Sequence, residues 1–176
     1  MKSLLAALTL GALLGACTPA TPGRIQPSLD AAPDVIDGAV SRSEAVRLLT
    51  ETTLRCTQAD HVVGLNQWVC EVDNSAGSDK ARYFVMLLAD AEDRLRFIDA
   101  QVFAVGDAGL VQRFASFFRD TVLSRLVPDL AGQDEAETWI EDRIGGSSSD
   151  DVGPVHMRLD RIDRTVRLQL SKATGI

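Results

Sequence analysis

The stretch "ARYFVMLLAD" (residues 81–90), followed after a short turn by "RLRFIDAQVFAV" (94–105), decides the fold. The first segment is an almost continuous apolar run, which is typical of a central strand with both faces at least partly covered. In the second segment Leu95 and Phe97 alternate with arginines, which is the period of a strand. Because only "AED" (91–93) separates the two segments, they predict an antiparallel hairpin.

Further elements follow on both sides of this hairpin. Ser41 and Glu44 fit a capping box that begins a helix, in which Ala45, Leu48, Leu49, Thr52 and Cys56 share one face. The other expected elements are a strand at 67–72, a long helix from Asp107 to Pro128, a helix from Asp134 to Ile144, and a hairpin of 155–162 with 165–173. Residues 74–79 and 145–154 read as loops. We therefore expect an α+β domain in the order α-β-β-β-α-α-β-β, with a single antiparallel sheet of about five strands and helices on one face.

The N-terminus has a different character. Lys2 precedes a short apolar run that is too brief to span a membrane, which is the layout of a secretory signal peptide. Leu14-Gly15-Ala16-Cys17 closes that run and resembles the lipobox of bacterial lipoproteins, with an aliphatic residue, two small residues and a cysteine. The resemblance covers only residues 1–17 and concerns export and attachment, not the fold.

The resemblance implies cleavage between Ala16 and Cys17, a diacylglyceryl group on the Cys17 sulfur and a third acyl chain on its amine. Two or more acyl chains give a stable membrane anchor, whereas one does not. Thr18 is not the aspartate that resembles an inner-membrane retention signal, so the expected location is the outer membrane, facing the periplasm. The alternative is an ordinary signal peptide cut near Ala20, which would release the protein.

The chain therefore divides into three expected parts. Residues 1–16 are the signal peptide, residues 17–40 are the lipidated N-terminus and a flexible tether with four of the six prolines, and residues 41–176 are the domain. A tether of this composition is a spacer that lets the domain stand away from the bilayer.

The three cysteines fit an exported lipoprotein. With Cys17 acylated, Cys56 and Cys70 remain, and in the oxidising periplasm we expect them to form a disulfide that joins the first helix to the sheet. The alternatives are free thiols or a metal site. The two histidines, His61 and His156, show no metal-ligand spacing, so we expect no metal and no cofactor.

No group of residues predicts catalysis. His61 lies in an expected loop and His156 on the polar side of a strand, and both read as solvated surface histidines. The pair Asp150-Asp151 lacks the regular spacing of a calcium loop and reads as solvated. Phe114, Phe117 and Phe118 have helical spacing and are expected to pack in the core.

Charge and anchor together favour a binding role. The formal charge is −7, and −8 once Lys2 is removed with the signal peptide, which argues against nucleic acid as a partner. We expect a non-enzymatic, lipid-anchored envelope protein that binds or scaffolds an envelope partner through a sheet face or an edge strand. The alternatives are a carboxylate-dependent envelope hydrolase and an inhibitor or immunity-type protein that presents a protruding loop at 57–66.

Overall fold

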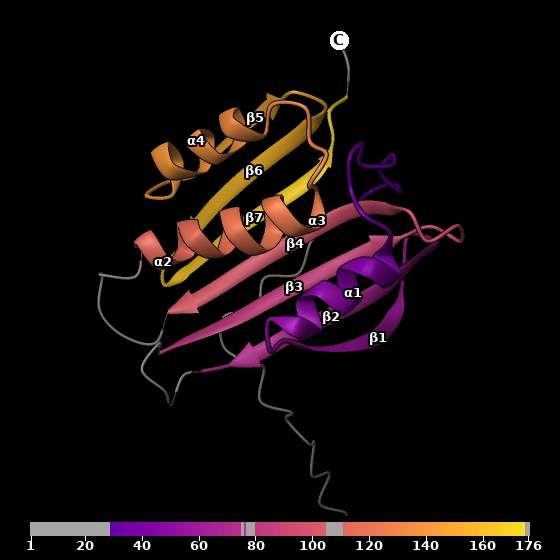
Figure 1. The fold of residues 1–176 in the computed structure, drawn as a ribbon, viewed down its shortest axis with the longest axis horizontal. Coiled ribbons are helices and arrows are strands. Elements are labelled where there is room, and N and C mark those ends of the chain that lie inside the picture. The colour runs from indigo at the N-terminus through magenta and orange to yellow at the C-terminus, as the bar shows by residue number, and fades with distance from the viewer. Residues whose placement is uncertain (1–28, 75, 77–79, 105–110, 175–176) are drawn as a thin grey trace, which may run out of the picture.

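The computed structural model describes residues 29–74, 76, 80–104 and 111–174. Its centre is one antiparallel sheet with the strand order β1-β2-β3-β4-β7-β6-β5 (Figure 1). The strands are β1 (Arg55–Val62), β2 (Leu65–Asp73), β3 (Ala81–Ala89), β4 (Leu95–Ala104), β5 (Ser148–Val152), β6 (Val155–Ile162) and β7 (Thr165–Lys172). The first four strands form one meander and the last three a second, and β4 and β7 join the two.

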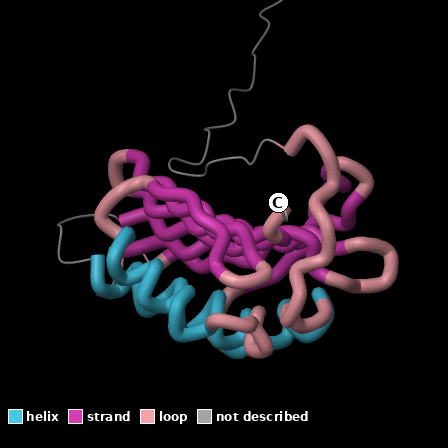
Figure 2. Tube along the Cα trace, turned by 90° about the horizontal axis from the view of Figure 1, so that it is seen from above, coloured by secondary structure: helices cyan, strands magenta, loops and turns pink. Residues whose placement is uncertain are grey.

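The described helices all lie on one face of this sheet (Figure 2). They are α1 (Arg42–Glu51), α2 (Val111–Ser116), the π-helix η2 (Phe117–Leu123), α3 (Ser124–Leu126) and α4 (Gln133–Arg143). Strand alternation turns one set of apolar side chains toward the helices, and these form the main core; they include Val85, Leu87, Ile98, Val102, Val166, Leu168 and Leu170. Helix α1 begins as expected, since the Ser41 hydroxyl accepts a hydrogen bond from the Glu44 N–H at 3.2 Å.

The prediction of about five strands in the order α-β-β-β-α-α-β-β is wrong, because the described residues form a sheet of seven strands. The two strands that were not expected are the edges, β1 and β5. Within the described residues each pairs with one neighbouring strand, and each is mostly exposed. Its sequence ("RCTQADHV" and "SSDDV") therefore lacks the apolar alternation of a half-buried strand. Half of the loop expected at 145–154 is therefore strand, and the loop expected at 57–66 is a hairpin with its turn at Val63-Gly64.

The long helix expected from Asp107 to Pro128 is also different. Asp107 lies outside the described residues, and the segment from Val111 to Leu126 is α-helical at its ends and a π-helix over seven residues in the middle. Phe114 and Phe118 are buried in the core and Phe117 packs partly exposed against it, so the expected packing role of these rings is confirmed.

The described part of the expected tether packs onto the domain. Leu29 contacts a small apolar cluster on the helix-free face, whereas Ile36 lies in the main core on the helical face and is only 2% exposed. The Ile36 N–H donates to the Leu95 carbonyl at 2.9 Å, and the Val40 N–H donates to the Leu126 carbonyl at 3.0 Å. The segment from Leu29 to Ile36 therefore passes around the end of the sheet, from the helix-free face to the helical face (Figure 2). Packing therefore begins well before residue 41.

Candidate functional site

The helix-free face of the sheet carries a second apolar cluster. Its members lie on β2, β3 and β4 and are at most 9% exposed: Leu65, Val69, Phe84, Met86, Leu88 and Phe97. Among the described residues, Leu29, Ala59 and Val62 pack against them. This cluster gives the sheet an apolar layer on each face, which explains why β3 reads as a continuous apolar run.

A buried ion pair lies beside this cluster. The guanidinium of Arg167 donates to both carboxylate oxygens of Asp99, at 2.9 and 2.7 Å, and the Gln101 amide nitrogen lies 3.3 Å from the same carboxylate. Asp99 is fully buried and Arg167 nearly so. A bidentate pair of this kind links β4 to β7 and satisfies charges that the sheet buries, so its role is structural.

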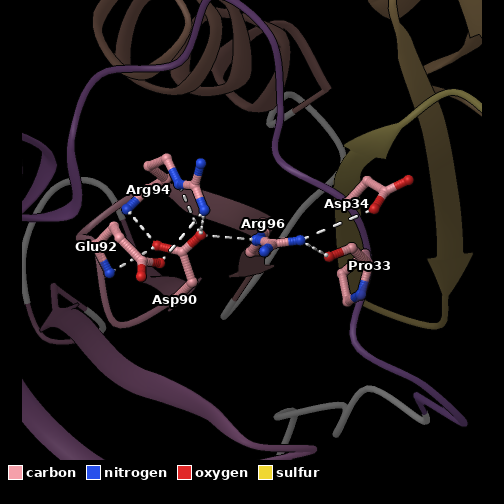
Figure 3. A network of polar contacts seen from close by, with 6 residues as sticks. All are labelled: Pro33, Asp34, Asp90, Glu92, Arg94 and Arg96. Carbon is pink, nitrogen blue, oxygen red and sulfur yellow. Dashed lines mark hydrogen bonds and ion pairs between the residues drawn. The ribbon is translucent and has the colours of Figure 1, made fainter.

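A second polar network surrounds the turn between β3 and β4 (Figure 3). The Asp90 carboxylate accepts from the main-chain N–H and the Nε of Arg94, both at 2.9 Å, and from the Nε of Arg96 at 3.0 Å. Burial raises the pKa of Asp90, but these hydrogen bonds and the arginine charges outweigh burial and lower the pKa to about 2. The Nη1 of Arg96 also donates to the Pro33 carbonyl at 3.0 Å and lies 3.9 Å from Asp34. The network therefore fixes the segment that precedes Ile36.

The first edge of the sheet is reinforced covalently. Cys56 and Cys70 form a disulfide, which confirms the prediction of that bond. Cys56 lies in β1 and not at the end of α1, so the bond joins two neighbouring strands instead of helix and sheet. The two Cα atoms are 3.9 Å apart, which marks a non-hydrogen-bonded pair. The main-chain N–H and C=O of Cys56 therefore point away from β2, toward the outer edge of β1. Because this direction alternates along a strand, the N–H and C=O of Gln58 point the same way.

The opposite edge brings together three side chains that the sequence did not connect. The Oγ of Ser149 lies 2.9 Å from the Nε2 of His156, and the Nδ1 of His156 lies 2.6 Å from the Oδ1 of Asp151. Ser149 and Asp151 are exposed on β5, and the His156 side chain on β6 is 39% exposed. His156 is therefore at the surface as expected, but it is held between a hydroxyl and a carboxylate.

The register of a tight hairpin produces this arrangement. Val152 pairs with Val155 across the two-residue turn Gly153-Pro154, which places Asp151 directly opposite His156. Gly153 has φ +56°, and a Cβ there would lie 2.3 Å from the Ala131 carbonyl oxygen, so the turn requires glycine. Reading residues 145–154 as a loop concealed the register, although the Gly153-Pro154 turn directly before the alternating segment 155–162 was the available signal.

The remaining expected site residues are placed as follows. Leu14, Ala16 and Cys17 lie outside the described residues. His61 is exposed on β1, and Asp150 and Asp151 lie on β5 instead of in a loop. In the part of the chain that the structure describes, no group of three His, Cys, Asp or Glu side chains is arranged to hold a metal ion, and no helix is long and apolar enough to cross a membrane.

Comparison with known proteins gives no assignment. No protein-family model, no curated protein and no solved structure matches this chain.

Proposed function

We propose that this protein is a lipid-anchored envelope protein that binds an extended segment of a partner protein along the edge of β1 that no described strand covers. The observation that carries the proposal is an eight-residue edge strand with five exposed residues, joined to its neighbour by a disulfide. An edge strand offers unpaired N–H and C=O groups, and partner segments can add to such an edge as a further strand.

The chemistry of β1 suits this mode of binding. It contains no proline, so each residue keeps its main-chain N–H, and the outward N–H groups belong to Cys56 and Gln58. Arg55 and Asp60 give the strand one charge of each sign. The disulfide supports the proposal because it holds the edge in the extended form before a partner arrives, which lowers the entropic cost of association.

The anchor belongs to the same proposal. Acylation of Cys17 would hold the domain at the membrane, and the twelve residue-to-residue steps from Cys17 to Leu29 reach at most about 40 Å when fully extended. The β1 edge would then sample partners within that distance of the periplasmic face. A Cys17→Ala variant is expected to leave the membrane fraction, whereas retention there would contradict the lipid anchor.

The strand-addition step can be tested in living cells. A photoreactive phenylalanine replaces Thr57, whose side chain is exposed on β1, and the control places it at the exposed Ile162 near the β6–β7 turn. We expect one dominant protein adduct from position 57, and loss of that adduct when Gln58→Pro removes an outward N–H.

Thr57→Pro is the matched comparison for stability. The Thr57 N–H points toward β2, so Thr57→Pro is expected to lower the melting temperature, whereas Gln58→Pro keeps the β1–β2 hydrogen bonds and lowers it less. An adduct of equal yield at positions 57 and 162, or one that persists unchanged in a folded Gln58→Pro protein, would refute binding at this edge.

A further inference from the structure

We propose that Ser149, His156 and Asp151 form a nucleophile site that cleaves neutral carboxylic esters. The site lies on β5 and β6, at the opposite edge of the sheet from β1, so it does not rest on the binding role proposed above. A hydroxyl within hydrogen-bond reach of an imidazole, which a third group orients, is the arrangement that activates a serine.

The bond to Asp151 decides which ring nitrogen of His156 carries the proton in the neutral imidazole. An ionised carboxylate only accepts hydrogen bonds, so Nδ1, at 2.6 Å from Asp151, carries the proton. In the neutral ring Nε2 is then the acceptor, and it lies 2.9 Å from the Ser149 Oγ. His156 is thereby oriented to take the hydroxyl proton of Ser149.

The outer edge of β5 supplies a hydrogen-bond donor for the carbonyl oxygen of the ester, which becomes negative when Ser149 attacks. The Asp151 N–H donates to the Asp150 carboxylate at 3.0 Å, so it does not point into the ladder with β6. The N–H of Ser149, two residues earlier on the same strand, points the same way, toward the open side of the edge strand β5. The main-chain N–H of the nucleophile itself is a recognised type of oxyanion donor.

The proposed reaction balances without a cofactor. The Ser149 Oγ bonds to the carbonyl carbon of the ester, and its proton passes to Nε2 of His156. The carbon–oxygen bond to the leaving alcohol then breaks, and Nε2 returns the proton to that oxygen. Water repeats the two steps on the acyl-serine, releases the acid and restores Ser149.

The surroundings indicate the class of ester. Asp150 and Asp151 are exposed carboxylates next to the serine, so they disfavour anionic substrates. Ser149 is exposed on an edge strand, which allows small or chain-end esters to approach from solvent. We therefore take p-nitrophenyl acetate as the substrate probe and a neutral fluorophosphonate as the covalent probe.

The experiment uses the full-length protein purified in detergent. The fluorophosphonate is expected to form an oxygen–phosphorus bond at Ser149 with release of fluoride, and peptide mass spectrometry locates the adduct. Ser149→Ala is expected to abolish the adduct, and His156→Gln to slow both labelling and hydrolysis by about 100-fold or more. Ser148→Ala is the matched control, because the side chain of Ser148 lies on the opposite face of the same strand.

Asp151 is a positioning residue and has its own readout. Asp151→Asn is expected to slow labelling and also to remove the downfield Nδ1–H signal of His156 from the NMR spectrum. All three side chains are at the surface, so the variants are expected to melt at the wild-type temperature. Absence of an adduct at Ser149 in the wild-type protein, or an undiminished labelling rate in folded His156→Gln, would overturn the proposal.

Discussion

Replacing Ile36 by alanine tests whether the segment before α1 is part of the folded domain. The side chain is 2% exposed in the main core, so the change removes three buried carbon atoms. At about 0.8 kcal/mol for each, the lost transfer free energy is about 2.4 kcal/mol. The cavity left behind raises the loss to about 3–4 kcal/mol. The main-chain hydrogen bond to Leu95 stays in place.

Urea denaturation of the purified protein, followed by tryptophan fluorescence, measures this loss. Val35→Ala is the matched control, because Val35 is the preceding residue and is partly exposed, and we expect it to cost at most about 1 kcal/mol. For a domain of this size, the Ile36→Ala loss corresponds to a fall of about 10 °C in melting temperature. Equal small losses in the two variants would show that the segment is a detachable tether and would refute this reasoning.

Three further predictions concern stability. Replacing Cys56 and Cys70 together by serine should lower the free energy of unfolding by about 3 kcal/mol, and wild type in reductant should match the variant. Gly153→Ala should cost about 1–3 kcal/mol through positive φ and its contact with a carbonyl, whereas Gly145→Ala, with open space around it, should cost less; similar losses would contradict the turn geometry. Asp90→Asn should destabilise the protein at neutral pH. Folding lowers the pKa of Asp90 from 3.8 to about 2, so its contribution to the free energy of unfolding is present above the pKa of the unfolded state and is lost as pH falls toward 2. Urea titrations should therefore show that the stability difference between wild type and Asp90→Asn narrows below about pH 4.

The sequence predicts the centre of this sheet better than its edges. Residues 81–89 and 95–104 form strands where the apolar run and the alternation indicated, because both faces of these strands are covered. An edge strand pairs on one side and faces solvent along much of its length, so burial does not impose an apolar pattern on it. Both strands that the sequence did not predict, β1 and β5, are edge strands of this kind.

The candidate sites also divide into one that the sequence predicts and others that depend on how the chain folds. The disulfide was predicted from cysteine count and compartment, which need no knowledge of the fold. The contact of Ser149 and Asp151 with His156 depends on register, and a register cannot be read while one of its two strands is taken for a loop. The burial of Ile36 was missed because one proline and three aspartates make up half of residues 30–37, a composition that is typical of an exposed segment.

The fixed turn between β3 and β4 has a mechanical consequence. A pull from the N-terminus first reaches the contact of Leu29 with the helix-free face. It then reaches the Pro33 carbonyl, which Arg96 holds, and the buried Ile36 side chain, before it reaches α1. The first resistance to tension is therefore the withdrawal of the Leu29 and Ile36 side chains and the rupture of a few hydrogen bonds at the end of the sheet. The hydrogen bonds between strands come under tension only after these contacts break, so the segment delays the transfer of an N-terminal pull to the sheet.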